Sequence, residues 1–383
     1  MGKHYYIGIM SGTSLDGIDV ALVAMPNNTI SLLGALEMPF EPKLRRDILA
    51  LCQTQTIALR DFGQLCVRLS LAYAKAVNQL LAQHQLNGND ICAIGCHGQT
   101  VYHLPGGPYP FSMQLINASV LAAETGITTI SDFRSMDLAL GGQGAPLVPP
   151  FHQQLFEHLQ QQYSALVLLN IGGIANVSIL SGQPLVGFDT GPGNVLMDLW
   201  LQQQNPEQLF DHNGELAAKG QVCDALLADC LADPYFALTA PKSTGRELFN
   251  FNWLQQKLIH YPALCFEDVL ATLSQLTAIS ISQSLTHLSP GLLLVCGGGA
   301  KNSHLLHNIQ ALLPNWQIEL TTNFGVDGDF MEAMAFAWLA KQCLERQNGN
   351  DMLVTGASRN EILGQICQLK HHQWQGDLTK DQQ

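Results

Sequence analysis

The hydrophobic and polar positions of this chain follow one order of elements twice. In the first half, apolar runs at residues 5–10 and 18–25 flank the polar turn SGTSLDG, and a third run begins at Thr29. In the second half, the runs ALVLLN, IANVSIL and PLVGFD are separated by a Gly-Gly turn and by SGQ. Apolar runs of this length, bounded by Gly, Ser and Asn, are typical of antiparallel strands. The pattern predicts a triplet of antiparallel strands in each half.

Each triplet is followed by a long segment with helical spacing, at residues 62–85 and 266–288. In the first of these segments, Leu65, Leu69 and Tyr73 recur at the spacing of one helix face. Each segment precedes a buried strand (ICAIGC or LLLVC), a polar glycine loop, a short helix and a last strand. Two βββαβαβ units in tandem predict an α/β protein with two similar lobes and a central cleft.

The join between the lobes is expected within residues 131–152, which are rich in Gly and Pro and show no clear period. A last helix is expected over residues 330–346. We therefore expect an N-terminal lobe of residues 1–131 plus about 345–383, and a C-terminal lobe of residues 132–344.

Length and charge narrow the class of protein. With 383 residues, 47% of them hydrophobic, the chain suits two domains better than one core. Lys and Arg number 18 against 31 Asp and Glu, so the formal net charge is -13. Such a surface repels nucleic-acid backbones and anionic lipid, and we expect neither nucleic acid nor a membrane as partner. A small phosphorylated ligand is still compatible, because backbone amides and a metal ion can hold it.

A cytoplasmic location is expected. The N-terminus MGKHYYIGIM lacks the regions of a secretory signal, and no apolar run approaches the roughly 18 residues of a membrane span. Ten cysteines are scattered without a CxxC pair, which favours reduced thiols over a disulfide framework.

The first glycine turn has residue types that can hold phosphate. Gly12 and Gly17 let the backbone approach a ligand, and the amides of Thr13 and Ser14 can point at phosphate oxygens. The Asp16 carboxylate could hold Mg²⁺ through water. The turn is not a Walker loop, because it lacks the Lys and Ser/Thr and a strand follows it. Taken alone, it is more typical of an Asp-Gly hairpin turn.

The second half carries two further glycine turns. The segment NIGGIAN (170–176) occupies the place of the first turn, and two such turns at matching positions would face each other across a cleft. The segment GGGAKN (297–302) follows a buried strand and opens a helix, whose N-terminus favours anions. Its glycines would let an adenine ring lie against the backbone. A Rossmann fingerprint fails, since Asn302 replaces the third glycine, and a plain strand-to-helix turn is the alternative.

Asp189 is the candidate general base. It lies in GFDTGPGN, at the carboxyl end of the third strand of the second copy, where ligands of open α/β sheets gather. A carboxylate on a rigid strand can accept a proton from water or a hydroxyl. The alternative is an Asx-turn, with Asn194 capping the helix that follows.

Polar side chains in the first lobe and in the last helix are candidates for substrate contacts. The loop CHGQT (96–100) matches no common zinc spacing, and we interpret it as lining the substrate pocket. Arg134 is suited to clamp a carboxylate through two parallel hydrogen bonds, the alternative being an ion pair with Asp132 or Asp137. Glu332 begins an apolar helix, where a first-turn Glu is common and by itself indicates no role.

Eight blocks of the sequence, in order between residue 7 and about residue 340, resemble the anhydro-N-acetylmuramic acid kinase family. They are IGIMSGTSLDGIDVAL, GCHGQTVYH, SDFR, GGQGAPLVP, NIGGIANVS, GFDTGPGN, CGGGAKN and EAMAFAWLA. The resemblance implies an actin-like ATPase (ribonuclease H-like) fold. It also implies an enzyme that uses ATP and water to convert an anhydro amino sugar into its 6-phosphate in cell-wall recycling, with Mg²⁺ as cofactor. The family's enzymes are typically homodimers, so a homodimer is expected.

The resemblance also implies residue roles. Asp189 corresponds to the general base, and the sugar contacts fall on Gln99, Arg134 and Glu332. The implied ATP-binding residues are Gly12, Thr13, Ser14, Leu15, Asp16, Gly17, Ile18 and Asp19 in the first turn, Gly172, Gly173 and Asn176 in the opposing turn, and Gly298, Gly299 and Asn302 around adenosine.

Two other hypotheses keep the fold. In an ordinary sugar kinase, Asp189 would deprotonate a free hydroxyl of the sugar. In an ATP-driven clamp, the nucleotide would change the shape of the protein and no small substrate would be phosphorylated.

Overall fold

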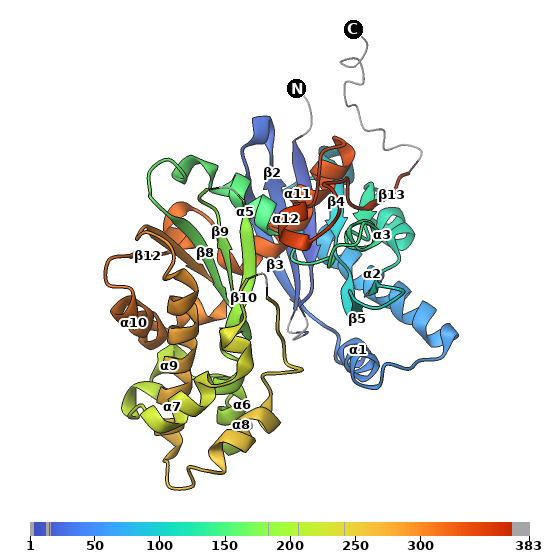
Figure 1. The fold of residues 1–383 in the computed structure, drawn as a ribbon. Helices are drawn as coiled ribbons and strands as arrows, with labels where there is room; N and C mark the ends of the chain where they lie inside the picture. The colour runs from blue at the N-terminus through green and yellow to red at the C-terminus, as the bar shows by residue number, and fades with distance from the viewer. Residues whose placement is uncertain are drawn as a thin grey trace. The chain divides into compact units, whose positions relative to one another are not determined.

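The computed structural model describes residues 4–12, 15, 17–182, 184–205, 207–240 and 242–369. The chain divides into a first unit, Met1–Leu155 with Phe330–Gln383, and a second unit, Phe156–Asp329 (Figure 1). The boundaries differ from the expected ones, since residues 132–155 and 330–344 belong to the first unit. The helix that begins at Met331 packs on the strands of the first unit, which explains its place there.

The first unit is built on a six-stranded mixed sheet with the strand order β13-β7-β4-β1-β2-β3. Strands β1, β2 and β3 are antiparallel, β1, β4 and β7 are parallel, and β13 is antiparallel to β7. The strands are β1 (Tyr5–Met10), β2 (Gly17–Ala24), β3 (Ser31–Pro39), β4 (Ile91–Cys96), β7 (Thr129–Ser131) and β13 (Gln365–Cys367). A separate hairpin consists of β5 (Gln99–Leu104) and β6 (Phe111–Leu115).

Seven helices of the first unit lie within the described residues. They are α1 (Pro42–Thr54), α2 (Leu59–Gln83), α3 (Ala118–Thr125), α4 (Ser135–Ala139), α5 (Pro149–Leu155), α11 (Met331–Leu344) and α12 (Met352–Thr355). The apolar face predicted from Leu65, Leu69 and Tyr73 is buried, so the spacing identified α2 correctly. The β5–β6 hairpin and α1 were not predicted.

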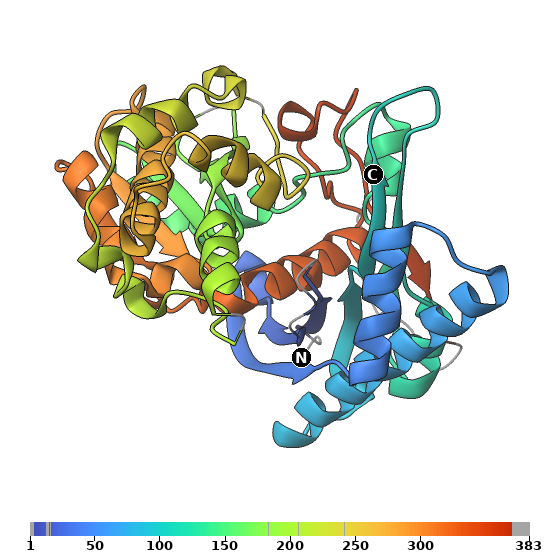
Figure 2. The same ribbon diagram turned by 90° about the horizontal axis from the view of Figure 1, so that it is seen from below.

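Two glycines let α11 approach the sheet of the first unit closely. A Cβ atom on Gly8 of β1 would overlap the backbone carbonyl of Ala333, and one on Gly95 of β4 would overlap that of Phe336. All residues of α11 except Glu332 and Gln342 are buried, in keeping with its apolar sequence. Figure 2 shows this helix in red against the strands of the first unit. Its position therefore depends on the missing side chains of the two glycines.

The second unit repeats the plan of the first. Its five-stranded sheet has the order β10-β9-β8-β11-β12, with β8, β9 and β10 antiparallel and β8, β11 and β12 parallel. The strands are β8 (Leu166–Ile171), β9 (Ile174–Ile179), β10 (Val186–Pro192), β11 (Leu292–Cys296) and β12 (Gln317–Leu320). Leaving β13 aside, both sheets follow the same strand order, so the predicted duplication of a βββαβαβ unit is confirmed. This duplicated plan is that of the actin-like ATPase fold.

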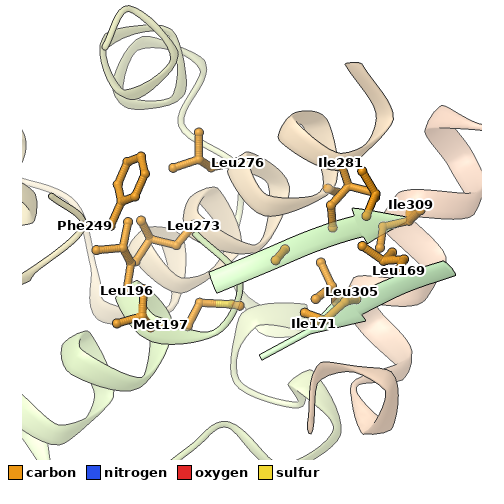
Figure 3. Packing of buried hydrophobic residues seen from close by; sticks show 14 of the residues in the cluster. Leu169, Ile171, Leu196, Met197, Phe249, Leu273, Leu276, Ile281, Leu305 and Ile309 are labelled. Carbon is orange, nitrogen blue, oxygen red and sulfur yellow. The ribbon is translucent and has the colours of Figure 1, made fainter. Parts of the chain in front are cut away.

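The helices of the second unit cover a continuous hydrophobic core. They are α6 (Val195–Gln204), α7 (Asp224–Leu231), α8 (Phe251–Leu258), α9 (Phe266–Leu285) and α10 (Ser303–Leu312). Figure 3 shows Leu169 and Ile171 of β8 in the same cluster as Leu273 and Leu276 of α9. Alternate residues of β8, β9 and β10 point into this core, which leaves the intervening residues on the other face of the sheet. Within the described part of the chain, no helix combines the length and apolar character needed to cross a membrane.

Replacing Gly95 by Ala should destabilise the protein, because the new methyl group meets a backbone carbonyl of α11 that cannot rotate away. We expect the free energy of unfolding to fall by about 2 kcal/mol or more, as for other overpacked cores. The measurement is urea unfolding followed by circular dichroism.

Gly63→Ala in α2 is the matched control, since a Cβ there meets nothing within 4 Å. Because Ala is the better helix former, this variant should gain up to about 1 kcal/mol. Equal stability of Gly95→Ala and the unchanged protein would mean that α11 does not need the glycine.

Candidate functional site

Polar side chains form a row across three strands of the second unit. Asn170 on β8 is opposite Asn176 on β9, and Asn176 is opposite Asp189 on β10. Directly opposite residues of paired strands point to the same face of a sheet. Their chain neighbours pack into the hydrophobic core of the unit, and these are Leu169, Ile171, Ala175, Val177 and Phe188. The row therefore lies on the face of the sheet opposite that core.

The carboxylate of Asp189 is held through one of its two oxygens. Oδ2 accepts the backbone N–H of Thr244 at 2.9 Å and the hydroxyl of Ser243 at 3.0 Å. No described residue donates a hydrogen bond to Oδ1. Burial raises the pKa of Asp189, the two donors lower it, and the negative charge of Glu247 raises it. The net shift is upward, which makes the carboxylate a better proton acceptor than an ordinary Asp.

Glycine turns meet beside this row, at the carboxyl ends of β8 and β11. The turn at Gly172 and Gly173 accepts backbone N–H groups of Gly193, Asn194 and Val195 through its carbonyl oxygens. A Cβ atom on Gly299 would collide with Ile171. Gly297 has φ +81°, a conformation that favours glycine, and its missing side chain leaves room for Asn170. The structure thus brings together the second phosphate turn and the adenosine turn that the sequence predicted separately.

Asn302, after the glycine turn at Gly297, and Asn194, after β10, have structural contacts. Asn302 Oδ1 accepts the backbone N–H of Leu305 at 3.0 Å, which caps α10. Asn194 does not cap α6 through its side chain, as the Asx-turn alternative supposed. Its Nδ2 instead donates to the carbonyl of Ile171 at 3.4 Å and so links β10 to β8.

The first glycine turn is described only in part, because Thr13, Ser14 and Asp16 lie outside the described residues. Leu15 is fully buried and its carbonyl accepts the Arg45 Nε–H at 2.9 Å. Its backbone N–H donates to the carbonyl of Gly12 at 3.1 Å.

At the base of that turn, Gly17, Ile18 and Asp19 begin β2. Ile18 is 1% exposed. The side chains of Leu15 and Ile18 are therefore packed inside the protein and do not face a ligand.

Arg134 of the first unit is fixed by two acceptors. Its Nε–H donates to Nε2 of His97 at 3.0 Å, and its Nη1–H donates to the carbonyl of Gly144 at 2.6 Å. His97 packs against the Phe336 ring of α11, with the ring centroids 4.7 Å apart. Burial lowers the pKa of Arg134 to about 10, so the guanidinium remains cationic at pH 7. Burial and the Arg134 charge hold the pKa of His97 well below its ordinary value, so His97 is neutral and can accept.

Neither carboxylate considered as an ion-pair partner of Arg134 bonds to it. Asp132 accepts from Ser135 and Gln365, whereas the buried Asp137 accepts from the Gly144 N–H, Asn350 and Thr355. Within the described ranges, Arg134 forms no salt bridge at all. Asp137 instead fixes the segment whose carbonyl holds the guanidinium. Among the described residues, no acidic side chain therefore pairs directly with the guanidinium of Arg134.

The remaining predicted substrate residues also lie in the first unit. Gln99 starts β5, is 1% exposed, and its Oε1 has no partner among the described residues. An unsatisfied buried acceptor of this kind is costly, and a bound hydroxyl or amide would satisfy it. Glu332 lies in the first turn of α11, and the residue as a whole is exposed. Its carboxyl group is surrounded by protein, which raises its pKa, whereas the positive charge of Arg134 opposes this shift.

Comparison with known proteins identifies the family. The model of the family described as anhydro-N-acetylmuramic acid kinase matches residues 4–369. The chain belongs to this family. An anhydro-N-acetylmuramic acid kinase of Pasteurella multocida (strain Pm70) is 50% identical over 366 residues, which cover 94% of this chain and 96% of that protein.

Distant structural similarities also exist. The activator of 2-hydroxyisocaproyl-CoA dehydratase from Clostridium difficile, with bound ADPNP, has a TM-score of 0.42 at 12% identity. The match covers 89% of this chain and 97% of the activator. The ROK hexokinase of Thermus thermophilus has a TM-score of 0.36 at 15% identity, with 88% and 99% covered.

The Mg²⁺ that the resemblance implies needs few protein ligands. The described part of the chain contains no group of three or more His, Cys, Asp or Glu side chains that could hold a metal. Mg²⁺ usually keeps several waters and takes one or two carboxylates together with substrate phosphates. The predicted water-mediated role of Asp16 is compatible with this, although Asp16 lies outside the described residues.

The sequence analysis missed the segment that holds Asp189. Ser243 and Thr244 lie 54 and 55 residues after Asp189, in a stretch without helical or strand periodicity. The run Lys-Ser-Thr-Gly was the only available signal, as a polar cluster with a glycine. Nothing in its spacing indicates which carboxylate it contacts.

Removing the cap of α10 separates two roles of Asn302. Asn302→Ala should lower the free energy of unfolding by about 1 kcal/mol, because the Leu305 N–H loses its acceptor. Asn302→Asp keeps an acceptor for the Leu305 N–H and should restore stability. Its negative charge should repel the phosphates of ATP, so ATP should bind more weakly than to the unchanged protein. Thermal unfolding and calorimetric titration with ATP measure the two effects. Binding of ATP by Asn302→Asp as tight as in the unchanged protein would leave Asn302 with the cap alone.

Proposed function

We propose that this chain is an ATP-dependent kinase that opens 1,6-anhydro-N-acetylmuramic acid with water and phosphorylates its 6-oxygen. The products are ADP and N-acetylmuramic acid 6-phosphate. Membership of the family supports the reaction. The mechanism is supported mainly by the hydrogen bonds of the Asp189 carboxylate. Its Oδ2 is held by two donors, whereas no described residue bonds to Oδ1.

Asp189 accepts a proton from the attacking water in this mechanism. The water oxygen bonds to the anomeric carbon, the bond from that carbon to the bridging 6-oxygen breaks, and the electron pair stays on the 6-oxygen. The upward shift of the Asp189 pKa makes this carboxylate a stronger base than an ordinary Asp. The 6-oxygen then forms a bond to the γ-phosphorus of ATP as the bond to ADP breaks.

The glycine turns of the second unit hold the nucleotide. Gly172 and Gly173 lie beside Gly298 and Gly299, and none of the four has a side chain that would keep a phosphate or a purine away. Asn176 is directly opposite Asp189, which supports a phosphate turn next to the proposed base. Asp16 would hold Mg²⁺ through water, and the ion would supply positive charge to the transferring phosphoryl group.

Arg134, Gln99 and Glu332 bind the sugar. The lactyl group of muramic acid carries a carboxylate, which an arginine fixed by His97 and Gly144 can bind without first losing side-chain freedom. Gln99 offers its unpaired Oε1 to a hydroxyl or amide of the sugar. Glu332 offers a carboxylate to the polar groups of the same ring.

The proposed setting is recycling of the bacterial cell wall, in the cytoplasm, by a homodimer. The family resemblance supports the pathway and the homodimer. The formal charge of -13 disfavours nucleic acid and anionic membranes as partners.

Assays of the anhydro sugar, glucose and N-acetylglucosamine side by side test the reaction. Only the anhydro sugar should be phosphorylated at a substantial rate. Asp189→Asn should lower kcat by at least about a hundredfold while ATP binding and thermal unfolding stay nearly unchanged, because the change removes a proton acceptor and little volume.

Phosphorylation of glucose at a comparable rate would favour an ordinary sugar kinase. ATP turnover that responds to none of the three sugars would favour an ATP-driven clamp.

Arg134→Ala should weaken binding of the anhydro muramic sugar by about 2 kcal/mol or more, since the carboxylate loses a charged, two-pronged donor. The matched substrate is the anhydro sugar of N-acetylglucosamine, which lacks the lactyl group and should lose much less. Binding constants for both sugars are measured with each protein. Equal losses would show that Arg134 does not bind the carboxylate.

A further inference from the structure

The strand that carries Asp189 lies at the edge of its sheet. β10 is paired with β9 on one side only, so the outward N–H and C=O groups of its backbone need other partners. At Asp189 both are provided. Its N–H donates to the carbonyl of Lys242 at 3.0 Å, and its carbonyl accepts the hydroxyl of Tyr235 at 2.7 Å. The backbone of Asp189 is therefore fixed on the open edge of the sheet.

The same segment also reaches the Asp189 side chain. Directly after Lys242, the hydroxyl of Ser243 and the backbone N–H of Thr244 both donate to Oδ2. Two donors on one oxygen stop the carboxyl group from turning about its terminal bond, which otherwise rotates easily. The oxygen with two donors has lone pairs already engaged, so the other oxygen is the better acceptor for a further proton.

We propose that Ser243 and Thr244 are positioning residues that hold Oδ2 of Asp189 and thereby make Oδ1 the atom that accepts the proton from water. This inference rests on the proposed role of Asp189 as general base. It deepens that role, because it names the proton-accepting atom and assigns a task to a segment outside the predicted site.

The groups around Asp189 determine how the pair of donors should affect its titration. Glu247 contributes a negative charge that raises the pKa of Asp189, and both donors lower it. Lys242 directs its amine at the Tyr235 ring, 4.7 Å from the centroid, and at the Tyr235 carbonyl. The Asp189 charge in turn helps raise the pKa of Tyr235, after burial. Loss of the Ser243 hydroxyl should therefore raise the pKa of Asp189.

Ser243→Ala is the informative substitution, because the Thr244 contact comes from the backbone and no side-chain change removes it. We expect kcat to fall about tenfold as the carboxylate gains freedom to turn, with the KM for ATP unchanged. The acidic limb of the profile of kcat/KM against pH should move to higher pH, because a carboxylate with fewer donors is protonated more easily. Ser243→Thr keeps a hydroxyl and should restore both the rate and the profile.

Ser164→Ala is the matched control. Ser164 is also an exposed serine of the second unit, and its hydroxyl donates to the carbonyl of Pro290, outside the site. This variant should keep the kcat and the pH profile of the unchanged protein. If Ser243→Ala is less stable but has an unchanged pH profile, the hydrogen bond from Ser243 to Asp189 has only a structural role, and the proposal is overturned.

Asp189→Asn, assayed in parallel, separates this inference from the proposed function. An inactive Asp189→Asn together with an unchanged Ser243→Ala profile would overturn the positioning role and leave the general base in place. An active Asp189→Asn would overturn both.

Discussion

Close packing of α11 on the sheet of the first unit is the constraint on which the arrangement there depends. At Gly8 and Gly95 the helix backbone occupies the space of the missing side chains. Phe336 of the same helix packs against His97, and His97 accepts a hydrogen bond from Arg134. Arg134 is thus held by a series of contacts that begins at two glycines. A methyl group added at either glycine would displace the helix, and with it the contacts of Phe336, His97 and Arg134.

In the second unit, an irregular segment holds Asp189 on the edge strand β10. Asp189 lies on an edge strand, where the outward backbone groups have no strand partner. A segment without regular secondary structure, around Ser243, supplies the missing partners to both the backbone and the carboxylate. The strand positions Asp189, and the loop orients its carboxylate. This division is common in enzymes, because loops tolerate the irregular backbone that specific hydrogen bonds require.

The duplicated plan explains why the proposed ligand-binding residues are spread so widely along the chain. Both halves place a glycine turn after their first strand, and the second half adds the turn at Gly297 after β11. Parallel strands such as β8 and β11 end at the same edge of a sheet, so turns that are more than a hundred residues apart meet there. The proposed nucleotide site of the second unit follows from that topology.

The sequence by itself determined the duplicated strand order, the long helix α2 and the positions of the glycine turns, because these depend on local periodicity and on residue type. It also singled out Asp189 as a candidate, by its residue type at the end of a strand. It also determined the family, since eight blocks recur in a specific order. Only the tertiary structure decided that α11 belongs with the first sheet and that Ser243 holds Asp189. Both are contacts between segments far apart in the chain, made where packing space or an unpaired backbone group happened to exist. Local sequence patterns do not predict contacts between distant segments, because such contacts depend on how the folded chain packs.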